Sequence, residues 1–268
     1  MAVSLTAVRD GTHLAYDVRG RVRGHLPIVL IHSLAMDHTF WNAVAPILSE
    51  DTAVLTYDCR GHGQSEKPGG PYMVEQFADD LADLLDHVGW HSAIVAGASM
   101  GGCITLAFAA AYPRRAAALG LFDTTAYYNA PEKWEQRAET AEAKGLEAML
   151  EFQTTRWFTD AFRASHKDVP DAAVAVFLAN PARCYAHTCR MLGACNLTAV
   201  LPRLNMPVRI AVGEEDYATP VSMSQTLHHG IAGSTLTVIP NARHLTPLEC
   251  PERIVFELQK LVEMAPAQ

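Results

Sequence analysis

The stretch VAGASMGG at residues 95–102 constrains the fold more than any other part of the chain. It places Ser99 between Gly97 and Gly101, after an apolar run and before the helix-forming stretch MGGCITLAFAAAYP. Between a strand and a helix, the pattern G-x-S-x-G forms a sharp turn, and its glycines relieve collisions that larger residues would cause. The serine oxygen then stands exposed at the start of the helix, where a neighbouring base can make it a nucleophile.

Apolar strands alternate with helical segments along most of the chain. A hairpin opens the sequence, with its turn at Asp10-Gly11. Apolar runs rich in Ile and Val predict further strands at residues 27–32, 53–58, 92–97, 117–123, 208–213 and 235–240. Apolar spacing of three and four residues predicts helices between them, such as VEQFADDLADLLDHVG. This order predicts an α/β fold with a mostly parallel sheet and right-handed crossovers.

The alternation of strands and helices breaks between Asp123 and Pro207. This interval is rich in helix formers and contains no convincing strand, so we expect a helical insertion there. The predicted domains are a core of residues 1–123 and 202–268 and a helical cap, or lid, of residues 124–201. Such a cap would close a pocket above the strand ends, where open α/β sheets bind ligands.

His244 is the predicted base for Ser99. In sites of this kind the chain order is serine, acid, histidine. Among the twelve histidines, His244 follows the last predicted strand and precedes the final helix, so its loop should return over the sheet. His32 and His62 lie in loops that should face the same site and are candidates for a supporting role.

Two aspartates compete for the position of the acid that orients His244. Asp216 follows the strand at 208–213, in AVGEEDYATP. Asp123 follows the strand before the cap, in LGLFDTT. Asp216 is the favoured candidate and Asp123 is the alternative.

The predicted oxyanion hole consists of backbone N–H groups, which a tetrahedral intermediate needs as donors. Met100, the residue after the nucleophile, should supply one of them. Leu34, in the loop HSLAMD after the strand at 27–32, should supply the other. Ser33 is a neighbouring candidate for contact with the substrate.

Composition excludes several classes of function. The chain has 268 residues, of which 49% are hydrophobic and 19% charged, so it can bury a large core and is not disordered. Its formal charge of −8 argues against the broad basic surface that nucleic acid or anionic lipid requires. A negatively charged substrate would therefore need a local basic contact.

The remaining sequence signals favour a cytoplasmic enzyme that acts on a small molecule. The N-terminus does not resemble a signal peptide, and no apolar run reaches the roughly 18 residues of a membrane span. The six cysteines fit neither a disulfide framework nor zinc spacing. We expect no metal or other cofactor and no membrane or nucleic-acid partner, and a homodimer is an option.

Together these motifs resemble the α/β-hydrolase superfamily over essentially the whole chain. The matching stretches, in the superfamily's order, are IHSLAMDHTFW, YDCRGHGQSEKP, GASMGG, VGEEDYATP and IPNARHLTPLECPERI. The resemblance implies an α/β-hydrolase fold, with a mostly parallel sheet flanked by helices and a helical cap insertion. It also implies that the loop from Asp58 to Ser65 is structural, so Arg60 is expected to be structural rather than catalytic.

The cap is similar to that of the 3-oxoadipate enol-lactonases of aromatic-compound breakdown. The similar residues are Asp123-Thr124-Thr125-Ala126, then Trp134, Gln136 and Arg137, and then GLEAMLEFQTTRWFT. The similarity implies ring opening of a small carboxylated enol-lactone by water, with Trp134 and Arg156 as substrate contacts. Two departures are the stretch His32-Ser33-Leu34-Ala35, where the family has Asn-Ser-Leu-Gly, and Asp123, where it has a neutral residue.

The favoured interpretation is a cofactor-independent serine hydrolase of a small lactone or ester, with Ser99, Asp216 and His244 as its catalytic residues. A C–C bond hydrolase or a general carboxylesterase would use the same three residues, and only the cap pocket separates these activities. A ligand receptor of the same fold is an alternative of another class. It would hydrolyse its ligand slowly or only once.

Overall fold

The computed structural model describes residues 3–266, and its eight strands form one sheet in the order β1-β2-β4-β3-β5-β6-β7-β8. The strands are β1 (Ser4–Ala7), β2 (His13–Arg19), β3 (Ile28–Ile31), β4 (Val54–Tyr57), β5 (Ala93–Ala98), β6 (Ala116–Phe122), β7 (Val208–Gly213) and β8 (Thr235–Ile239). The first two form the expected hairpin, and β2 is antiparallel to β4. All other neighbours are parallel, which confirms the predicted mostly parallel sheet.

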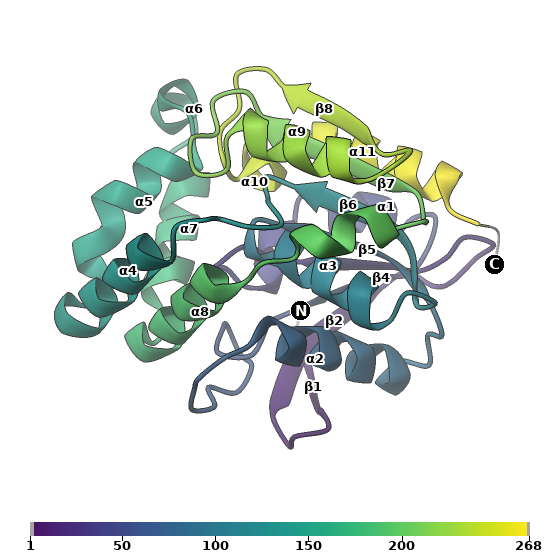
Figure 1. The fold of residues 1–268 in the computed structure, drawn as a ribbon, viewed down its shortest axis with the longest axis horizontal. Coiled ribbons are helices and arrows are strands. Elements are labelled where there is room, and N and C mark those ends of the chain that lie inside the picture. Colours follow the sequence, from purple (N-terminus) through teal and green to yellow (C-terminus); the bar gives the residue numbers. More distant parts are fainter. Residues whose placement is uncertain (1–2, 267–268) are drawn as a thin grey trace.

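Helices cover both faces of this sheet (Figure 1). The helices of the core are the short 3₁₀ helix His38–Trp41, α1 (Ala45–Leu48), α2 (Val74–His87), α3 (Met100–Ala111), α9 (Val221–Gly230), α10 (Thr246–Glu249) and α11 (Pro251–Met264). Because of this cover, every residue of β3, β4 and β5 is buried, as expected for parallel strands with two covered faces. None of the described helices combines the length and the apolar character needed to cross a membrane.

The direction of the crossovers reverses between β3 and β5. The connection from β3 through α1 runs to β4 on one side of β3, whereas the connection from β4 through α2 runs back past β3 to β5. Right-handed crossovers in opposite directions place their helices on opposite faces, and α11 packs on the same face as α1. The carboxyl ends of β3 and β5 therefore flank a topological switch point, where open α/β sheets bind ligands.

The interval between β6 and β7 is helical, as predicted. Its helices are α4 (Pro131–Lys144), a 3₁₀ turn at Glu147–Met149, α5 (Leu150–Trp157), α6 (Asp160–Ser165), α7 (Asp168–Leu178), α8 (Ala182–Ala194) and a 3₁₀ helix at Thr198–Arg203. In Figure 1 helices α4 to α8, coloured teal to green, gather at one end of the sheet. An antiparallel bridge between Tyr127 and Asn196 joins the two ends of this insertion.

The domain limits at residues 123/124 and 201/202 stay a prediction. The structure describes most of both predicted parts, but residues 1–2 and 267–268, at the two ends of the predicted core, lie outside the described residues.

Candidate active site

Ser99 occupies a strained turn between β5 and α3. Its φ of 53° and ψ of −113° lie in a region that residues with side chains rarely adopt, and such strain collects at functional sites. The two glycines make the turn possible. A Cβ on Gly97 would lie 2.2 Å from the carbonyl carbon and oxygen of Gly101, and a Cβ on Gly101 would lie 2.3 Å from the carbonyl oxygen of Ile31.

A chain of hydrogen bonds connects Ser99, His244 and Asp216. The Oγ atom of Ser99 lies 3.0 Å from Nε2 of His244, and Nδ1 of His244 lies 2.8 Å from Oδ2 of Asp216. All three side chains are buried. This geometry allows the imidazole to take a proton from Ser99 while the carboxylate stabilises the imidazolium that forms.

The surroundings of Asp216 hold its carboxylate in the ionised form. Oδ1 accepts hydrogen bonds from the backbone N–H groups of Ala218 (2.7 Å) and Thr219 (2.9 Å), and Oδ2 accepts one from the Thr219 hydroxyl (2.7 Å). Burial acts to raise the pKa of Asp216, but His244 and these donors outweigh it and lower that pKa below its usual value. Thr219 was not predicted from the sequence, because nothing in its local pattern marks it as a partner of the acid.

Asp123, the alternative acid, forms no hydrogen bond or ion pair with His244. Its carboxyl group accepts hydrogen bonds from the backbone N–H groups of Gly213 (3.1 Å) and Thr246 (3.2 Å) and lies 2.5 Å from the Thr246 hydroxyl. Burial, with the negative charge of Asp216 nearby, raises the pKa of Asp123 well above its usual value. Asp123 thus ties the loop of the acid to the loop of the histidine without entering the hydrogen-bond chain.

The two predicted oxyanion donors lie next to Ser99 and are free. The N–H groups of Leu34 and Met100 donate to no other group among residues 3–266. Met100 begins α3, so its N–H also lies at the positive end of that helix. Leu34 and Ser33 line the cavity above Ser99. A substrate oxygen at this position would find two backbone donors without other partners.

His32 fixes the peptide that carries the N–H of Leu34. Its Nδ1 lies 2.7 Å from the carbonyl oxygen of Ser33, and its Nε2 accepts a hydrogen bond from the N–H of Cys59 (3.0 Å). Nδ1 must therefore carry the proton and donate it. Burial lowers the pKa of His32, which keeps the ring neutral and in this tautomer. Because the Ser33 carbonyl and the Leu34 N–H belong to one peptide unit, the ring sets the direction of both.

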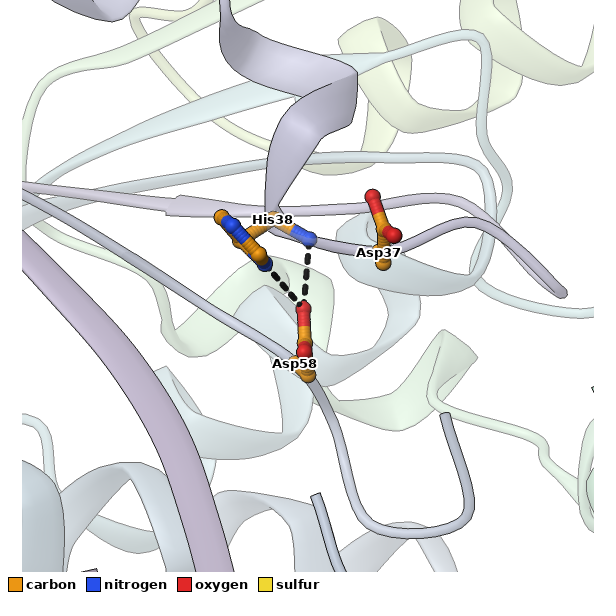
Figure 2. Close-up of side chains that lie close together, drawn as sticks. All are labelled: Asp37, His38 and Asp58. Carbon is orange, nitrogen blue, oxygen red and sulfur yellow. Dashed lines mark hydrogen bonds and ion pairs between the residues drawn. The ribbon is translucent and has the colours of Figure 1, made fainter. Parts of the chain in front are cut away.

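Figure 2 shows a second set of hydrogen bonds that holds the loop after β3, between His38 and Asp58. Oδ1 of Asp58 accepts hydrogen bonds from the backbone N–H of His38 (2.6 Å) and from its Nδ1 (2.7 Å). Oδ2 accepts one from the N–H of Gln64 (2.7 Å). Ligand-type atoms of Asp37, His38 and Asp58 lie within 4.8 Å of one another. The hydrogen bonds of Asp58 to His38 and Gln64 explain why these three side chains lie close together. The cluster connects the loop after β3 to the loop after β4.

Arg60, which the resemblance marks as structural, lies away from the cavity. It forms a bidentate ion pair with the buried Asp80, at 2.6 and 2.7 Å, and a further pair with Asp10 at 2.9 Å. These contacts join the loop after β4 to α2 and to the opening hairpin.

A small cavity above Ser99 opens toward a larger chamber under the cap. The cavity has a volume of about 30 Å³ and is lined by Ser33, Leu34, Ser99, Tyr128, Trp134, Arg137, Gln153, Arg156, Trp157, Ala218, Thr219 and His244. The chamber measures about 660 Å³ and shares five of these residues: Tyr128, Trp134, Arg137, Arg156 and Ala218. The predicted cap contacts Trp134 and Arg156 thus lie at the junction of the two spaces.

Arg137 and Arg156 carry positive charge into this junction without a carboxylate partner among residues 3–266. Arg137 donates to the hydroxyl of Tyr185, from Nε at 3.0 Å and from Nη2 at 2.6 Å, and its guanidinium lies 4.6 Å from the Trp134 ring centre. Arg156 lies 4.7 Å from the ring centre of Phe152. Burial and the neighbouring charge of Arg137 lower the pKa of Arg156.

Six of the site residues predicted from the sequence line one cavity: Ser33, Leu34, Ser99, Trp134, Arg156 and His244. The other two lie beside it, because Asp216 is hydrogen-bonded to His244 and Met100 follows Ser99 at the start of α3. The cavity lining also includes six residues that the prediction did not: Tyr128, Arg137, Gln153, Trp157, Ala218 and Thr219. A signal for Arg137 was present, because it lies three positions after Trp134 and residues so spaced share a helix face. Tyr128 and Gln153 lie in segments whose sequence pattern does not indicate which side chains face a cavity.

Comparisons with known proteins agree with this geometry. Residues 27–251 match the family described as alpha/beta hydrolase fold. The chain is 30% identical over 225 residues to 3-oxoadipate enol-lactonase 2 of Acinetobacter baylyi, a match that covers 84% of each protein. Among solved structures, the enol-lactonase of Burkholderia xenovorans is 30% identical with a TM-score of 0.93, over 97% of this chain and 100% of that one.

A thermophilic esterase from Thermogutta terrifontis is also similar, at 29% identity and a TM-score of 0.91 over 98% of both chains. The family match and the enol-lactonase relative each cover most of the sequence, and the two solved structures superpose on 97–98% of this chain. The chain therefore belongs to the α/β-hydrolase family and is similar over most of its length to the 3-oxoadipate enol-lactonases.

Proposed function

We propose that this protein is a cofactor-independent serine hydrolase that opens a small carboxylated lactone, in the manner of a 3-oxoadipate enol-lactonase. The coarser statement, that it is a hydrolase acting on ester bonds, follows from the family and from the lactonases and esterases that it resembles. The finer proposal concerns the catalytic residues and the substrate.

In the proposed reaction, His244 removes the proton of Ser99 as Oγ attacks the carbonyl carbon. The N–H groups of Leu34 and Met100 hold the oxyanion, and Asp216 stabilises the positively charged imidazole. Collapse of the tetrahedral intermediate breaks the bond to the ring oxygen, which receives the proton from His244. Water, activated by the same histidine, then releases the acyl group and restores Ser99. The 3.0 and 2.8 Å hydrogen bonds of His244 support these roles.

The observation that carries the choice of substrate is the pair of unpaired arginines at the junction above Ser99. Arg137 and Arg156 are half-buried. Charges that are partly withdrawn from water are ordinarily paired, because burial without a partner costs free energy. Arg137 and Arg156 lack a carboxylate partner among the described residues, and both line the space that a substrate must occupy. A substrate carboxylate would supply the missing charge, and it would explain how a chain of net charge −8 attracts an anion.

A matched pair of substrates tests this proposal: an enol-lactone with a free carboxylate and its methyl ester. We expect multiple turnover of the acid by the wild type and none by Ser99→Ala. Arg156→Gln and Arg137→Gln should raise KM for the acid by roughly 10-fold or more, since a hydrogen-bonded charge pair is lost, and should change KM for the neutral ester little.

Arg163→Gln is the control, because this cap arginine pairs with Asp160 on the surface and does not line the cavity. Equal effects on the acid and the ester would refute the carboxylate site while leaving the serine chemistry in place. Turnover confined to a vinylogous diketone or to a short aryl ester would favour the C–C hydrolase or the carboxylesterase. A single turnover followed by tight binding would favour the receptor.

A further inference from the structure

The hydroxyl of Tyr128 is a buried polar group with no hydrogen-bond partner among residues 3–266. Its side chain lines both the cavity above Ser99 and the chamber under the cap. The Ser99 hydroxyl and the Cys103 thiol are near enough to influence the pKa of the phenol. Neither meets the distance and angle requirements of a hydrogen bond with it. Because a buried hydroxyl without a partner destabilises a folded protein, its position at a substrate cavity points to a partner on the substrate.

The structure holds this hydroxyl in place and keeps it protonated. Tyr128 follows Tyr127, whose backbone pairs with Asn196 at the base of the cap. The Tyr128 ring packs edge-on against Trp134, with 4.9 Å between ring centres. Burial raises the pKa of the phenol well above its usual value, so the group is a hydrogen-bond donor wherever the enzyme is folded and active.

The topology determines the side from which Tyr128 reaches Ser99. Strands β3 and β6 flank β5 on opposite sides. Leu34, the proposed oxyanion donor, comes from the loop after β3, whereas Tyr128 comes from the segment after β6. The loops of Asp216 and His244 follow β7 and β8, beyond β6 on that same side. Tyr128 therefore approaches on the side of the histidine, which in serine acyl transfer is the side of the leaving group.

We propose that Tyr128 is a catalytic residue that donates a hydrogen bond to the leaving oxygen of the substrate, which in a lactone is the ring oxygen. The inference rests on the serine mechanism proposed above. As Oγ of Ser99 bonds to the acyl carbon, the bond from that carbon to the leaving oxygen breaks. The serine proton passes through His244 to the leaving oxygen, while Tyr128 keeps its own proton.

This hydrogen bond should strengthen as negative charge develops on the leaving oxygen, so it lowers the barrier rather than only binding substrate. The amount by which this hydrogen bond lowers the barrier depends on the leaving group. A 4-nitrophenolate carries its charge without help, whereas an alkoxide or an enolate gains more from a donor. The predicted signature is thus a change in how rate depends on the pKa of the leaving group.

The test is kcat/KM, which reports the first bond-breaking step, for esters that share one acyl group and differ in their leaving alcohol or phenol. Tyr128→Phe should lose about 10- to 100-fold on the alkyl ester and only a few-fold on the 4-nitrophenyl ester. The larger loss reaches the lower end of the roughly 100- to 1,000-fold effect of removing one oxyanion donor, because His244 still protonates the leaving oxygen. Tyr127→Phe is the matched control, since the Tyr127 side chain does not line the cavity, and it should follow the wild type across the series.

An equal loss across the series would overturn the proposal, because it would assign Tyr128 to the oxyanion or to folding, and no loss would overturn it as well. The melting temperature of Tyr128→Phe should equal or exceed that of the wild type, since the change removes an unpartnered buried hydroxyl. Failure of the underlying mechanism is a distinct result: the wild-type activity would then survive in Ser99→Ala.

Discussion

Replacing Asp216 with asparagine should reverse the tautomer of His244. The carboxylate accepts two backbone N–H groups at Oδ1, from Ala218 and Thr219, so the amide oxygen of an asparagine must take that position. The amide NH₂ would then face Nδ1 of His244 and donate to it. The proton of the imidazole would move to Nε2, which faces Ser99 and could no longer accept the serine proton.

The expected cost follows from losing the base while the geometry stays intact. An Asp-to-Asn change of this kind lowers kcat by about 10⁴-fold, which corresponds to about 5.5 kcal/mol of barrier. Steady-state kcat on the carboxylated lactone, or on an aryl ester, measures it. KM should change little, because Asp216 is not among the residues that line the cavity.

The control is Asp123→Asn, an identical change at the other buried carboxyl group. Asp123 forms no hydrogen bond with His244, so an amide at this position leaves the tautomer of the histidine unchanged. The amide loses one backbone N–H partner, because both carboxyl oxygens of Asp123 accept from a backbone N–H. We expect kcat to fall by less than about 10-fold, because the change should shift the loops of Asp216 and His244 only slightly. If Asp216→Asn keeps most of its activity while Asp123→Asn loses it in a folded protein, the assignment of the acid is wrong.

Three further changes test the parts of the site that support Ser99. His32→Phe removes the donor to the Ser33 carbonyl and should lower kcat by about 10- to 100-fold at a nearly constant KM; an unchanged kcat would contradict the role of the ring. The hydrogen bond to Asp58 raises the pKa of His38, so the stability that this pair contributes is complete below the ordinary histidine pKa of about 6.5 and is lost as pH rises through the raised value. Urea unfolding of wild type and His38→Leu should therefore show a stability difference that narrows with rising pH, and a widening difference would reverse the argument. Gly101→Ala places a Cβ 2.3 Å from a carbonyl oxygen and should lower the free energy of unfolding by about 3 kcal/mol, whereas Gly69→Ala, with open space around it, should change it by less than about 0.5 kcal/mol.

The sequence predicted those parts of the site in which a chemical role also requires a particular backbone geometry, since that geometry leaves a pattern in the sequence. Ser99 needs small neighbours in a tight turn, and this need leaves glycines at fixed positions. His244 and Asp216 follow strands of a parallel sheet, whose carboxyl ends meet at one edge, so chain order alone places them together. The same reasoning assigns the proposed oxyanion donor to Leu34, although a backbone N–H leaves no mark in the sequence.

The residue pattern alone predicted the cap as helix but did not show which of its side chains face the cavity, and Trp134 and Arg156 were identified through the family resemblance. Arg137, Arg156 and Arg163 all lie on cap helices, yet only the first two face the cavity. Periodicity within one short helix shows which residues share a face, but it does not show against what that face packs. Whether a cap arginine faces the substrate or forms an ion pair on the surface depends on its neighbours in space, which can lie far away in the chain. One such neighbour is Tyr185, whose hydroxyl accepts a hydrogen bond from Arg137.

The cap is fastened to the same loops that carry the proposed catalytic groups. Nδ2 of Asn180, between α7 and α8, donates to the carbonyl oxygen of Ala35 in the oxyanion loop at 2.9 Å. Arg243, which precedes His244, donates to the carbonyl oxygen of Phe158 at 2.9 Å. A shift of the cap would therefore pull on the oxyanion loop and on the histidine loop together. Substitutions that enlarge the chamber for a bulkier substrate should then lower kcat even for small substrates, unless they leave these two attachments intact.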